Sequence, residues 1–492
     1  MAAAAQSSLG RTESVASYVW ILAAAGLVAF GAASGVAIAF GEVNAFYITL
    51  SAILGAAIMV DYRVGAVLLI LLLPLVATFF LPHSMFGIPA LNPFNIVLLA
   101  TLGSYLLRGK IGRFLPQPLV WLYIVPILIG GAIGVPNVLD IRQYFFDLGG
   151  LNFTEGFGYY REMVIRPLLI VMVALLVGAA IARAQKPERF IAAIAVSAVM
   201  MALIEFAFII ASGVRLGALA SPTARAFFED FGLHANDLGR MFAVAYALLV
   251  FVWWETKNSN MKTGLFITLC IIGLGLLLTF SRGGMMGLAV ATGVFLLWKF
   301  NARSFAMVFG AAVIGLAIAP EALWDRITFG FGTGNMNVVS AGRIDGIWAP
   351  LLPEVLVSPI WGNGLGSIMW SAPMLNDSML LVGHAHNAYL EAALDMGFVG
   401  LALLLAYYVH VWRGFRALGS NAYLSPDMRA FFQGSCAALA VFVVTGWTGS
   451  SLRPEAEFGY LWIAIGMMYG MLARKPEPGQ ASAQQAATPA RP

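Results

Sequence analysis

The sequence is poor in charge. Only 11% of its 492 residues are Asp, Glu, Lys or Arg, whereas 60% are hydrophobic and the mean hydropathy is +0.85. A water-soluble domain usually carries about 25% charged residues, and no soluble core could bury this much apolar surface. The shortage of charge excludes a soluble enzyme, a disordered protein and a nucleic-acid-binding domain, and it predicts a polytopic membrane protein with the lipid bilayer as its surroundings.

Cysteine is almost absent, and no repeat of 20–50 residues is visible. The two cysteines, Cys270 and Cys436, both lie in apolar runs, so the chain offers neither a disulfide framework nor a metal-binding spacing. The first 17 residues are small and polar, and the apolar run from Tyr18 is too long for a cleavable signal.

Long apolar runs dominate what remains. A membrane span needs roughly 20 apolar residues in a helix, and about fourteen runs qualify; because several are short, a neighbouring pair could form a re-entrant hairpin and reduce the count to twelve. The expected fold is all-α with about 12–14 transmembrane helices. The expected parts are a cytoplasmic segment 1–17, a transmembrane bundle 18–320, a large periplasmic loop 321–396 with short helices, transmembrane helices 397–474, and a disordered cytoplasmic tail 475–492.

Charge asymmetry predicts the direction of the spans. With the N-terminus in the cytoplasm, eighteen of the 28 basic residues fall on the inner side, and the long loops 135–164, 213–238 and 321–396 fall outside, as the positive-inside rule requires. The ten outer cations are all arginine, and all six lysines lie inside. The planar guanidinium fork suits phosphate and carboxylate, so this bias favours an outer anion site; a GC-rich genome that favours Arg is the alternative explanation.

Two arginines stand out beside glycines. Ser281-Arg282-Gly283-Gly284 ends one apolar run and opens the next, which places Arg282 at the outer boundary of the membrane, where glycines leave room for a ligand. Arg282 could instead reach into the headgroups. Arg343 begins a stretch with apolar residues at helical spacing, which predicts an amphipathic helix on the outer surface.

Glycines alternate in Gly362-Asn363-Gly364-Leu365-Gly366. This pattern suits a loop whose amides face an anion or an ordinary tight turn.

The segment from Gly383 to Gly400 holds two histidines. A short helix from about His386 to Met396, closed by Gly397, would put His386 on one face with Tyr389, Leu390 and Ala393. His384 precedes that helix and is expected to face water or cap a turn. A metal site at His384 and His386 is disfavoured, because zinc usually takes three or four protein ligands.

Weaker candidates lie elsewhere on the outer side and within a span. The first group precedes or opens two spans and comprises Arg161, Arg166, Asn236 and Arg240; Arg161 with Glu162 could also be a simple interfacial pair. Glu205 lies inside a span, where a buried acid serves a proton path or packs two helices as a neutral carboxyl.

Together these motifs resemble the O-antigen ligase and O-antigen polymerase superfamily of bacterial cell-envelope glycan biosynthesis. The resemblance covers roughly residues 264–412, and Asn236 matches more loosely. The pieces that carry it, in order, are Ser281-Arg282-Gly283-Gly284, Gly342-Arg343 with Trp348, Gly362 to Gly366, and His386-Asn387-Ala388-Tyr389-Leu390 with Gly397 and Gly400.

The resemblance implies a GT-C-like, metal-independent, inverting glycosyltransferase without a cofactor, acting at the periplasmic face of the bacterial inner membrane. The donor would be a glycan on undecaprenyl diphosphate, and the acceptor either lipid A–core (ligase) or another lipid-linked glycan (polymerase), in lipopolysaccharide or exopolysaccharide biosynthesis. The family's two arginines and histidine map to Arg282, Arg343 and His386. His384 has no place in the family pattern.

Further contacts to diphosphate or glycan are expected from side chains near these motifs, namely Arg161, Arg166, Asn236, Arg240, Asn387 and Tyr389. A flippase or transporter for lipid-linked glycans is the alternative function. Transporters commonly show internal repeats, and the absence of a visible repeat favours the enzyme.

Overall fold

The computed structural model describes most of the chain. The described residues are 35, 41–108, 115–147, 151, 153–220, 227–228, 230–376, 382–449 and 451–474. The expected first span 18–40, the N-terminal segment and the tail 475–492 lie outside this part, apart from residue 35. The chain divides into two compact units, one of residues 1–65 and 81–109 and the other of residues 66–80 and 110–492.

The smaller unit is built on a helix pair. Helix α2 (Val43–Val60) packs against α4 (Pro93–Arg108), which follows a short hairpin of β1 (Ser84–Met85) and β2 (Ile88–Pro89). The Ser104 hydroxyl donates to the Ile58 carbonyl at 2.7 Å and joins the two helices. Helix α3 (Tyr62–Leu72) continues from this unit into the larger one.

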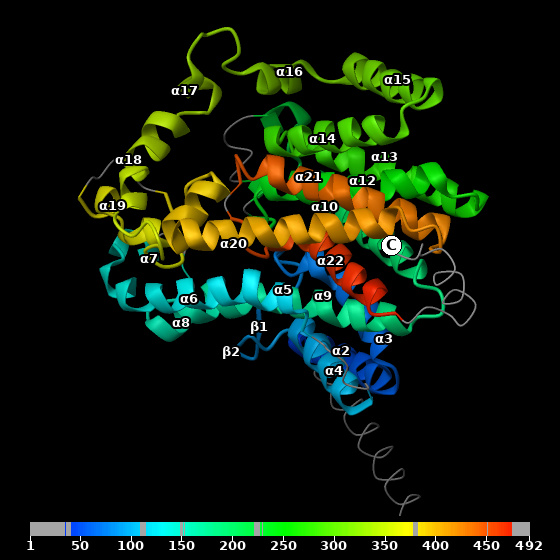
Figure 1. Ribbon diagram of the computed structural model, residues 1–492, viewed down its shortest axis with the longest axis horizontal. Coiled ribbons are helices and arrows are strands. Elements are labelled where there is room, and N and C mark those ends of the chain that lie inside the picture. The colour runs from blue at the N-terminus through cyan, green and yellow to red at the C-terminus, as the bar shows by residue number, and fades with distance from the viewer. Residues whose placement is uncertain are drawn as a thin grey trace, which may run out of the picture. The chain divides into compact units, whose positions relative to one another are not determined.

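The larger unit contains the long helices (Figure 1). Two of them run through a π-helical turn, so that α5, η2 and α6 follow one another without a break, as do α8, η4 and α9. In chain order the long helices and their parts are α5 (Gln117–Leu119), η2 (Val120–Ile124), α6 (Val125–Gly134), α8 (Gly156–Tyr160), η4 (Arg161–Ile165), α9 (Arg166–Arg183), α10 (Arg189–Ala211), α12 (Ala235–Glu255), α13 (Ser259–Leu278), α14 (Arg282–Lys299), α15 (Ala302–Ile318), α20 (Ala388–Gly419), α21 (Pro426–Thr445) and α22 (Gly459–Leu472).

Short helices occupy the connections. They are η1 (Leu73–Leu75), η3 (Val135–Asp140), α7 (Gln143–Asp147), η5 (Leu216–Ala220), α16 (Glu321–Thr328), α17 (Met336–Val339), η6 (Ile344–Trp348), α18 (Ala349–Leu351), η7 (Pro353–Leu356), η8 (Ser367–Trp370), α19 (Ala372–Asn376) and η9 (Ala456–Phe458).

The fold is that of an all-α polytopic membrane protein, as the hydropathy predicts. Within the described residues, eight helices are long and apolar enough to cross a membrane, and four shorter apolar helices accompany them. Each expected span in this part of the chain overlaps a helix; these spans are 43–60, 65–80, 93–107, 117–134, 165–182, 190–212, 239–254, 264–280, 284–300, 305–320, 397–412, 429–449 and 459–474. The eight helices are Val43–Val60, Gln117–Asp140, Gly156–Arg183, Arg189–Ala211, Ala235–Glu255, Ser259–Leu278, Ala388–Gly419 and Pro426–Thr445.

Helix α12 is the central element of the larger unit. It packs against α13, α14 and α21 (Figure 1), and it is apolar on nearly all sides, as expected of a helix that other helices surround. Glycines let its neighbours come close: a Cβ on Gly284 of α14 would meet the backbone of Gly239, and one on Gly434 of α21 would meet the carbonyls of Ala247 and Leu248. Close backbone contact through small residues is typical of membrane helices.

Proline explains the three π-helical turns. Each of η2, η4 and η6 ends two residues before a proline, namely Pro126, Pro167 and Pro350. A proline cannot donate to the carbonyl four residues back, so the hydrogen-bond ladder widens at that point. The sequence contained this signal, but hydropathy does not reveal it.

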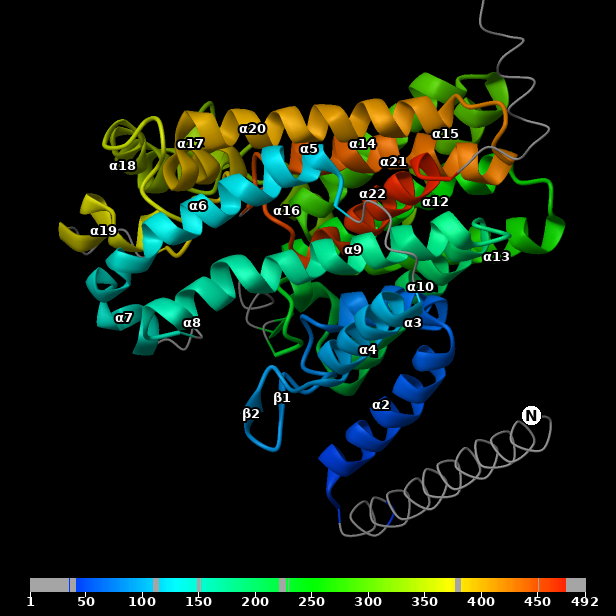
Figure 2. The ribbon, with the colours of Figure 1, turned by 60° about the horizontal axis from the view of Figure 1, so that its bottom comes forward.

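The three loops expected on the outer side lie together in the larger unit. Figure 2 shows α7, α8, α18 and α19 at one end of that unit. Arg142 donates to the Met374 carbonyl at 3.1 Å, and Asn137 donates to the Asn363 carbonyl at 3.4 Å. Helix α16 in turn lies against η5. Loops 135–164 and 213–238 thus both contact loop 321–396.

A packing test follows from α9 and α22. A Cβ on Gly466 would meet the carbonyl of Ala174, so we expect Gly466→Val to lower the melting temperature of the purified protein, since overpacking typically costs about 1–3 kcal/mol. The control is Gly264→Val, where a Cβ meets nothing within 4 Å. Equal losses in differential scanning fluorimetry would contradict this role for Gly466.

Candidate functional site

The site begins where α14 meets α12. Ser281 caps α14: its hydroxyl accepts from the Gly284 N–H at 3.0 Å and donates to the Asn236 amide oxygen at 3.0 Å. The two glycines after Arg282 are helical and do not form the turn. The left-handed turn falls on Phe280, with φ 48°, and Gly284 serves the contact with Gly239. Asn236 therefore holds the arginine-bearing helix end in place.

Arg282 joins α14 to the long loop. Its guanidinium donates to the Val339 carbonyl at 3.2 Å and reaches the Phe329 carbonyl at 3.5 Å. Val339 ends α17, four residues before Arg343. The two predicted arginines, which are 61 residues apart in sequence, therefore lie on neighbouring segments.

Arg343 directly precedes the helical stretch that its sequence predicts. Ala341 and Gly342 take left-handed conformations, and η6, α18 and η7 follow. The Trp348 indole N–H donates to the Ala385 carbonyl at 2.9 Å. This bond ties the Arg343 segment to the two histidines.

The histidine segment is held on both sides of Ala385. Its N–H donates to Glu391 Oε2 at 3.2 Å, and its carbonyl accepts from Trp348. His386 has φ 50°, a left-handed conformation that costs energy in a non-glycine residue. These two bonds hold the backbone that sets the place of His386.

His386 precedes the helix that was expected to carry it. Helix α20 begins at Ala388 with Asn387 as its N-cap, whose amide oxygen accepts from Tyr389 N–H at 3.1 Å and Leu390 N–H at 3.2 Å. The prediction that His386 shares a helical face with Tyr389 was wrong, because a capping Asn adopts extended backbone. The predicted end is confirmed: Gly397, with φ 65°, interrupts α20.

Asn387 and Tyr389 have structural partners. Asn387 is 7% exposed and its amide oxygen caps α20. The Tyr389 hydroxyl donates to the Val443 carbonyl, and its ring lies 5.5 Å from that of Trp447. Both side chains thus hold the start of α20 against the end of α21.

His384 is half-buried and lies against His386. Its Nδ1 accepts from the His386 N–H at 3.3 Å, and the ring centroids are 3.9 Å apart. His384 therefore caps a turn, which is one of the two placements that the sequence predicts.

The surroundings of His384 keep it neutral. Burial lowers its pKa to about 4; Asp237 opposes this shift, while the positive charges of Arg240 and Arg343 add to it. Arg343 is thus close enough to act on the histidine segment. Because the unfolded chain binds this proton near the ordinary value of 6.5, acidification below that pH disfavours the fold.

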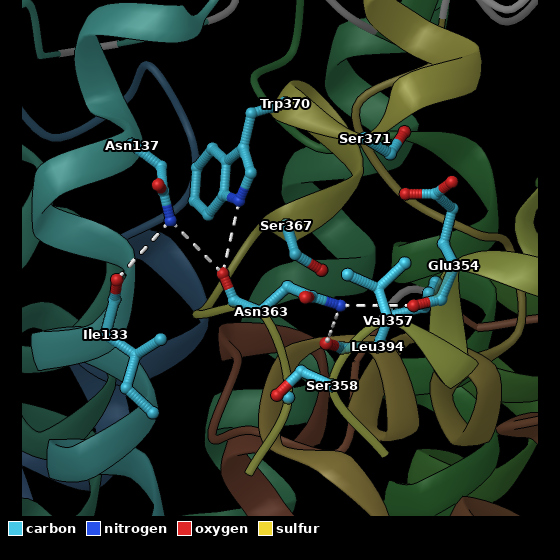
Figure 3. A pocket seen from close by; sticks show the side chains of 11 residues that line it. Ile133, Asn137, Glu354, Val357, Ser358, Asn363, Ser367, Trp370, Ser371 and Leu394 are labelled. Atoms are coloured by element: carbon cyan, nitrogen blue, oxygen red, sulfur yellow. Dashed lines mark hydrogen bonds between the residues drawn. The ribbon is translucent and has the colours of Figure 1, made fainter.

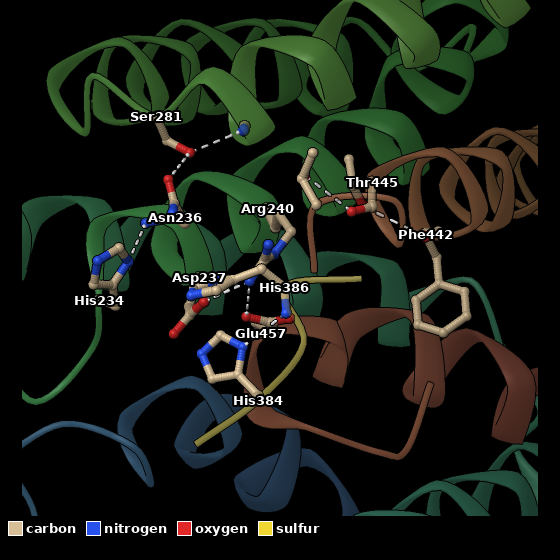
Figure 4. A network of polar contacts seen from close by, with 12 residues as sticks. His234, Asn236, Asp237, Arg240, Ser281, His384, His386, Phe442, Thr445 and Glu457 are labelled. Carbon is tan, nitrogen blue, oxygen red and sulfur yellow. Dashed lines mark hydrogen bonds and ion pairs between the residues drawn. The ribbon is translucent and has the colours of Figure 1, made fainter. Parts of the chain in front are cut away.

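Arg240 lies in a buried ion-pair network (Figure 4). It is 3% exposed, and one of its nitrogens is 2.6 Å from Asp237 Oδ1 and 3.0 Å from Glu457 Oε2. Figure 4 also places His234, His384 and His386 around this network. The guanidinium pairs with both carboxylates and joins α12 to η9, and the expectation that Arg240 binds substrate stays a prediction.

Arg453 forms a second ion-pair centre that the sequence motifs do not reveal. Its guanidinium lies 3.7 Å from Glu391 and donates to the Met163 carbonyl at 3.4 Å. That carbonyl is the one that Pro167 leaves without its helical donor. Burial would lower the pKa of Arg453, but the carboxylates of Asp395 and Glu391 raise it above the ordinary value. The sequence did hold one signal for this centre: two acids, Glu391 and Asp395, lie four residues apart on an otherwise apolar helix.

Arg161 and Arg166 share one carboxylate. Glu162 lies 3.3 Å from Arg161 and 2.9 Å from Arg166, so the interfacial pair that the sequence left open is present. Their side chains are 36% and 52% exposed. Arg161 begins the π-helical turn η4 that Arg453 contacts, and Arg166 begins α9 directly after it.

The glycine-rich loop, residues 362–366, packs against the backbone of α20. The N–H of Asn363 donates to the Leu394 carbonyl at 2.8 Å, and that of Gly364 to the Asp395 carbonyl at 3.0 Å. A Cβ on Gly362 would meet the Asp395 backbone. Since these amides already have acceptors in the protein, the turn interpretation holds and the anion interpretation does not.

Two remaining candidates show no ligand chemistry. Glu205 is fully buried beside Gly275 and Phe242, and neither carboxyl oxygen has a hydrogen-bond partner among the described residues. In the same part of the chain, no three His, Cys, Asp or Glu side chains are grouped so as to hold a metal ion.

The geometry and the sequence point to one class. Residues 265–405 match the family model described as O-antigen ligase. The match runs from α13 into α20 and contains Arg282, Arg343 and His386. A search of curated proteins finds no match. Residues 265–405 therefore carry an O-antigen ligase domain within a multi-pass membrane protein, which supports the resemblance to the O-antigen ligase and polymerase superfamily. A domain of this family suggests a glycosyltransferase-like enzyme.

The Arg240 network can be tested through stability. Arg240→Met would leave the buried Glu457 and the half-buried Asp237 without their cation, and breaking a buried pair typically costs about 3–5 kcal/mol. We expect a clear fall in melting temperature, and a partial recovery when Glu457→Gln is added. Wild-type stability of Arg240→Met with lost transfer activity would instead favour contact with substrate.

Proposed function

We propose that this protein transfers a glycan from undecaprenyl diphosphate to an acceptor hydroxyl at the periplasmic face of the inner membrane. The acceptor is lipid A–core or another lipid-linked glycan. The observation that carries the proposal is the chain of contacts Arg282 to Val339, Trp348 to Ala385, and His384 to His386, which gathers the three motif residues inside the segment that matches the ligase family.

In the proposed reaction an acceptor hydroxyl oxygen attacks the anomeric carbon from the side opposite the diphosphate. The bond between that carbon and the diphosphate oxygen breaks, its electron pair stays on the diphosphate, and the configuration inverts. Arg282 and Arg343 stabilise the charge that develops there, because fixed donors act most strongly where charge appears in the transition state. Two arginines in this role make a metal ion unnecessary.

His386 takes the proton that the hydroxyl loses. A positioned general base contributes about 10²–10⁴-fold to a rate, and an alternative role for His386 is to orient the acceptor. His384 is neutral at physiological pH and holds the His386 backbone through its Nδ1, so it acts as a positioning residue. Glu391 and Trp348 hold the same segment from the Ala385 peptide.

Arg161 and Arg166 remain proposed contacts to the glycan or diphosphate, since both are partly exposed. Asn236, Arg240, Asn387 and Tyr389 are proposed as further contacts to diphosphate or glycan, and they also support the site through α12, α14 and α20. All of these proposals place the reaction beside the three long loops that contact one another.

The arginines are tested by conservative replacement. Lys keeps the charge but lacks the guanidinium fork, so Arg282→Lys and Arg343→Lys should each lose most transfer activity; removal of one such donor typically lowers kcat by about 10²–10³-fold. The assay measures transfer from undecaprenyl-diphosphate glycan at equal protein levels. Arg215→Lys, at an exposed loop position, is the control. Near wild-type transfer by both site variants would refute the role of the fork.

The histidines are tested together with a chelator. His386→Ala should abolish transfer while donor binding survives, and His384→Ala should have a smaller effect, because it removes only a backbone contact of His386. EDTA should leave activity unchanged. An active His386→Ala enzyme would remove the base assignment, and chelator-sensitive activity that added metal restores would favour a metal site at His384 and His386.

A further inference from the structure

A cavity of about 320 Å³ lies near Leu394, just before the break in α20 at Gly397 (Figure 3). His386 lies at the other end of this first part of the helix. The size of the cavity falls within the range of about 300–1,000 Å³ that is typical of small-ligand sites. Leu394 lines it, seven residues after the N-cap Asn387, and at 1.5 Å per residue the cavity lies roughly 10 Å along the helix from the histidine segment. Its lining comes from the Gly134 end of α6, the η7 region, the glycine-rich loop, η8 and α20, and comprises Ile133, Asn137, Glu354, Val357, Ser358, Gly362, Asn363, Ser367, Trp370, Ser371 and Leu394.

The amides in this lining offer acceptors. Both hydrogens of the Asn363 side-chain amide are used, by the Glu354 carbonyl at 3.2 Å and the Leu394 carbonyl at 3.4 Å. The Asn137 amide likewise donates to the Ile133 and Asn363 carbonyls, each at 3.4 Å. Within the described residues neither amide oxygen has a donor, so both remain available to a ligand.

Glu354 and Ser358 extend this acceptor set. One carboxylate oxygen of Glu354 accepts from the Ala372 N–H at 3.2 Å, which fixes the side chain and leaves the other oxygen available. Ser358 contributes a hydroxyl that has no partner among the described residues. The cavity therefore suits a molecule that presents several hydrogen-bond donors at once.

One wall of the cavity is flat and apolar. The Trp370 indole N–H donates to the Asn363 carbonyl at 3.1 Å, so its ring is held in one orientation. In Figure 3, Asn137 and Trp370 lie on one side, and Glu354 and Ser371 lie on the other. A ring with C–H groups on its faces and hydroxyls around its edge matches this combination of aromatic surface and peripheral acceptors.

We propose that this cavity binds one sugar residue of the glycan substrate, away from the reacting end. The proposal rests on the proposed function, because a glycan whose end lies at His386 would place a later sugar about 10 Å away. A cation is the less suitable occupant: the lining holds a single carboxylate, whereas Ca²⁺ takes six to eight oxygen ligands, and the cavity is far larger than an ion needs.

Sugar binding is measured without turnover. Saturation-transfer NMR of the purified full chain with free glucose, galactose, mannose and N-acetylglucosamine should show transfer to at least one of them. Ser358→Trp should abolish that signal by filling the cavity, and Glu354→Gln should weaken binding several-fold while keeping the side chain's shape. Ser420→Trp, at an exposed serine after α20, is the matched control and should bind normally.

Three results would overturn the proposal: no saturation of any of the four sugars, equal saturation in wild type and Ser358→Trp, or displacement of the sugar by Ca²⁺ alone. Transfer kinetics then identify the source of the sugar. A higher KM of Ser358→Trp for the acceptor alone assigns the cavity to the acceptor glycan, a higher KM for the donor alone assigns it to the donor, and unchanged KM values contradict the proposal. Failure of the proposed function would be distinct, since wild type would then bind a sugar but transfer nothing.

Discussion

Both the N–H and the carbonyl of Ala385 are hydrogen-bonded to side chains from other parts of the chain. Glu391 accepts from its N–H and Trp348 donates to its carbonyl, and the residue that follows, His386, is held in a left-handed conformation. Arg453 keeps Glu391 in place and also reaches the Met163 carbonyl that Pro167 leaves free. The position of one imidazole therefore depends on four separate parts of the chain, and none of the four need contact substrate.

The outer arginines divide into two groups. Arg240 is buried and Arg453 is 12% exposed; both pair with carboxylates and hold helices together, which is how a chain with few charges tolerates them inside a bundle. Arg282 and Arg343 are half-buried beside the long loop. Several outer arginines, Arg142 and Arg282 among them, also donate to backbone carbonyls. The arginines of these loops thus use the several N–H groups of the guanidinium to hold backbone carbonyls.

The fold could be read from hydropathy because span length and apolar composition are local properties. The helix end at Gly397 also followed from the sequence. So did the closeness of the segments that carry Arg282, Arg343 and His386. The position of His386 did not, because the predicted helix start at His386 lies two positions before the observed start at Ala388, and Asn387 between them is the N-cap. Glu391, Arg453 and Glu457 were missed because their importance comes from burial against distant segments. The role of the amides in the glycine-rich loop could not be predicted for the same reason, because their acceptors, the Leu394 and Asp395 carbonyls, lie on the distant helix α20.

The break at Gly397 has a mechanical consequence. The carbonyls of Leu394 and Asp395, which a continuous helix would satisfy internally, accept from Asn363 and Gly364, and the Phe398 N–H donates to the Pro359 carbonyl. The loop 359–364 thus completes the hydrogen bonding of both halves of α20. It cannot swing away on its own, because its departure would leave both helix ends without partners. The first part of α20, residues 388–396, therefore links this loop at one end to the histidine segment at the other.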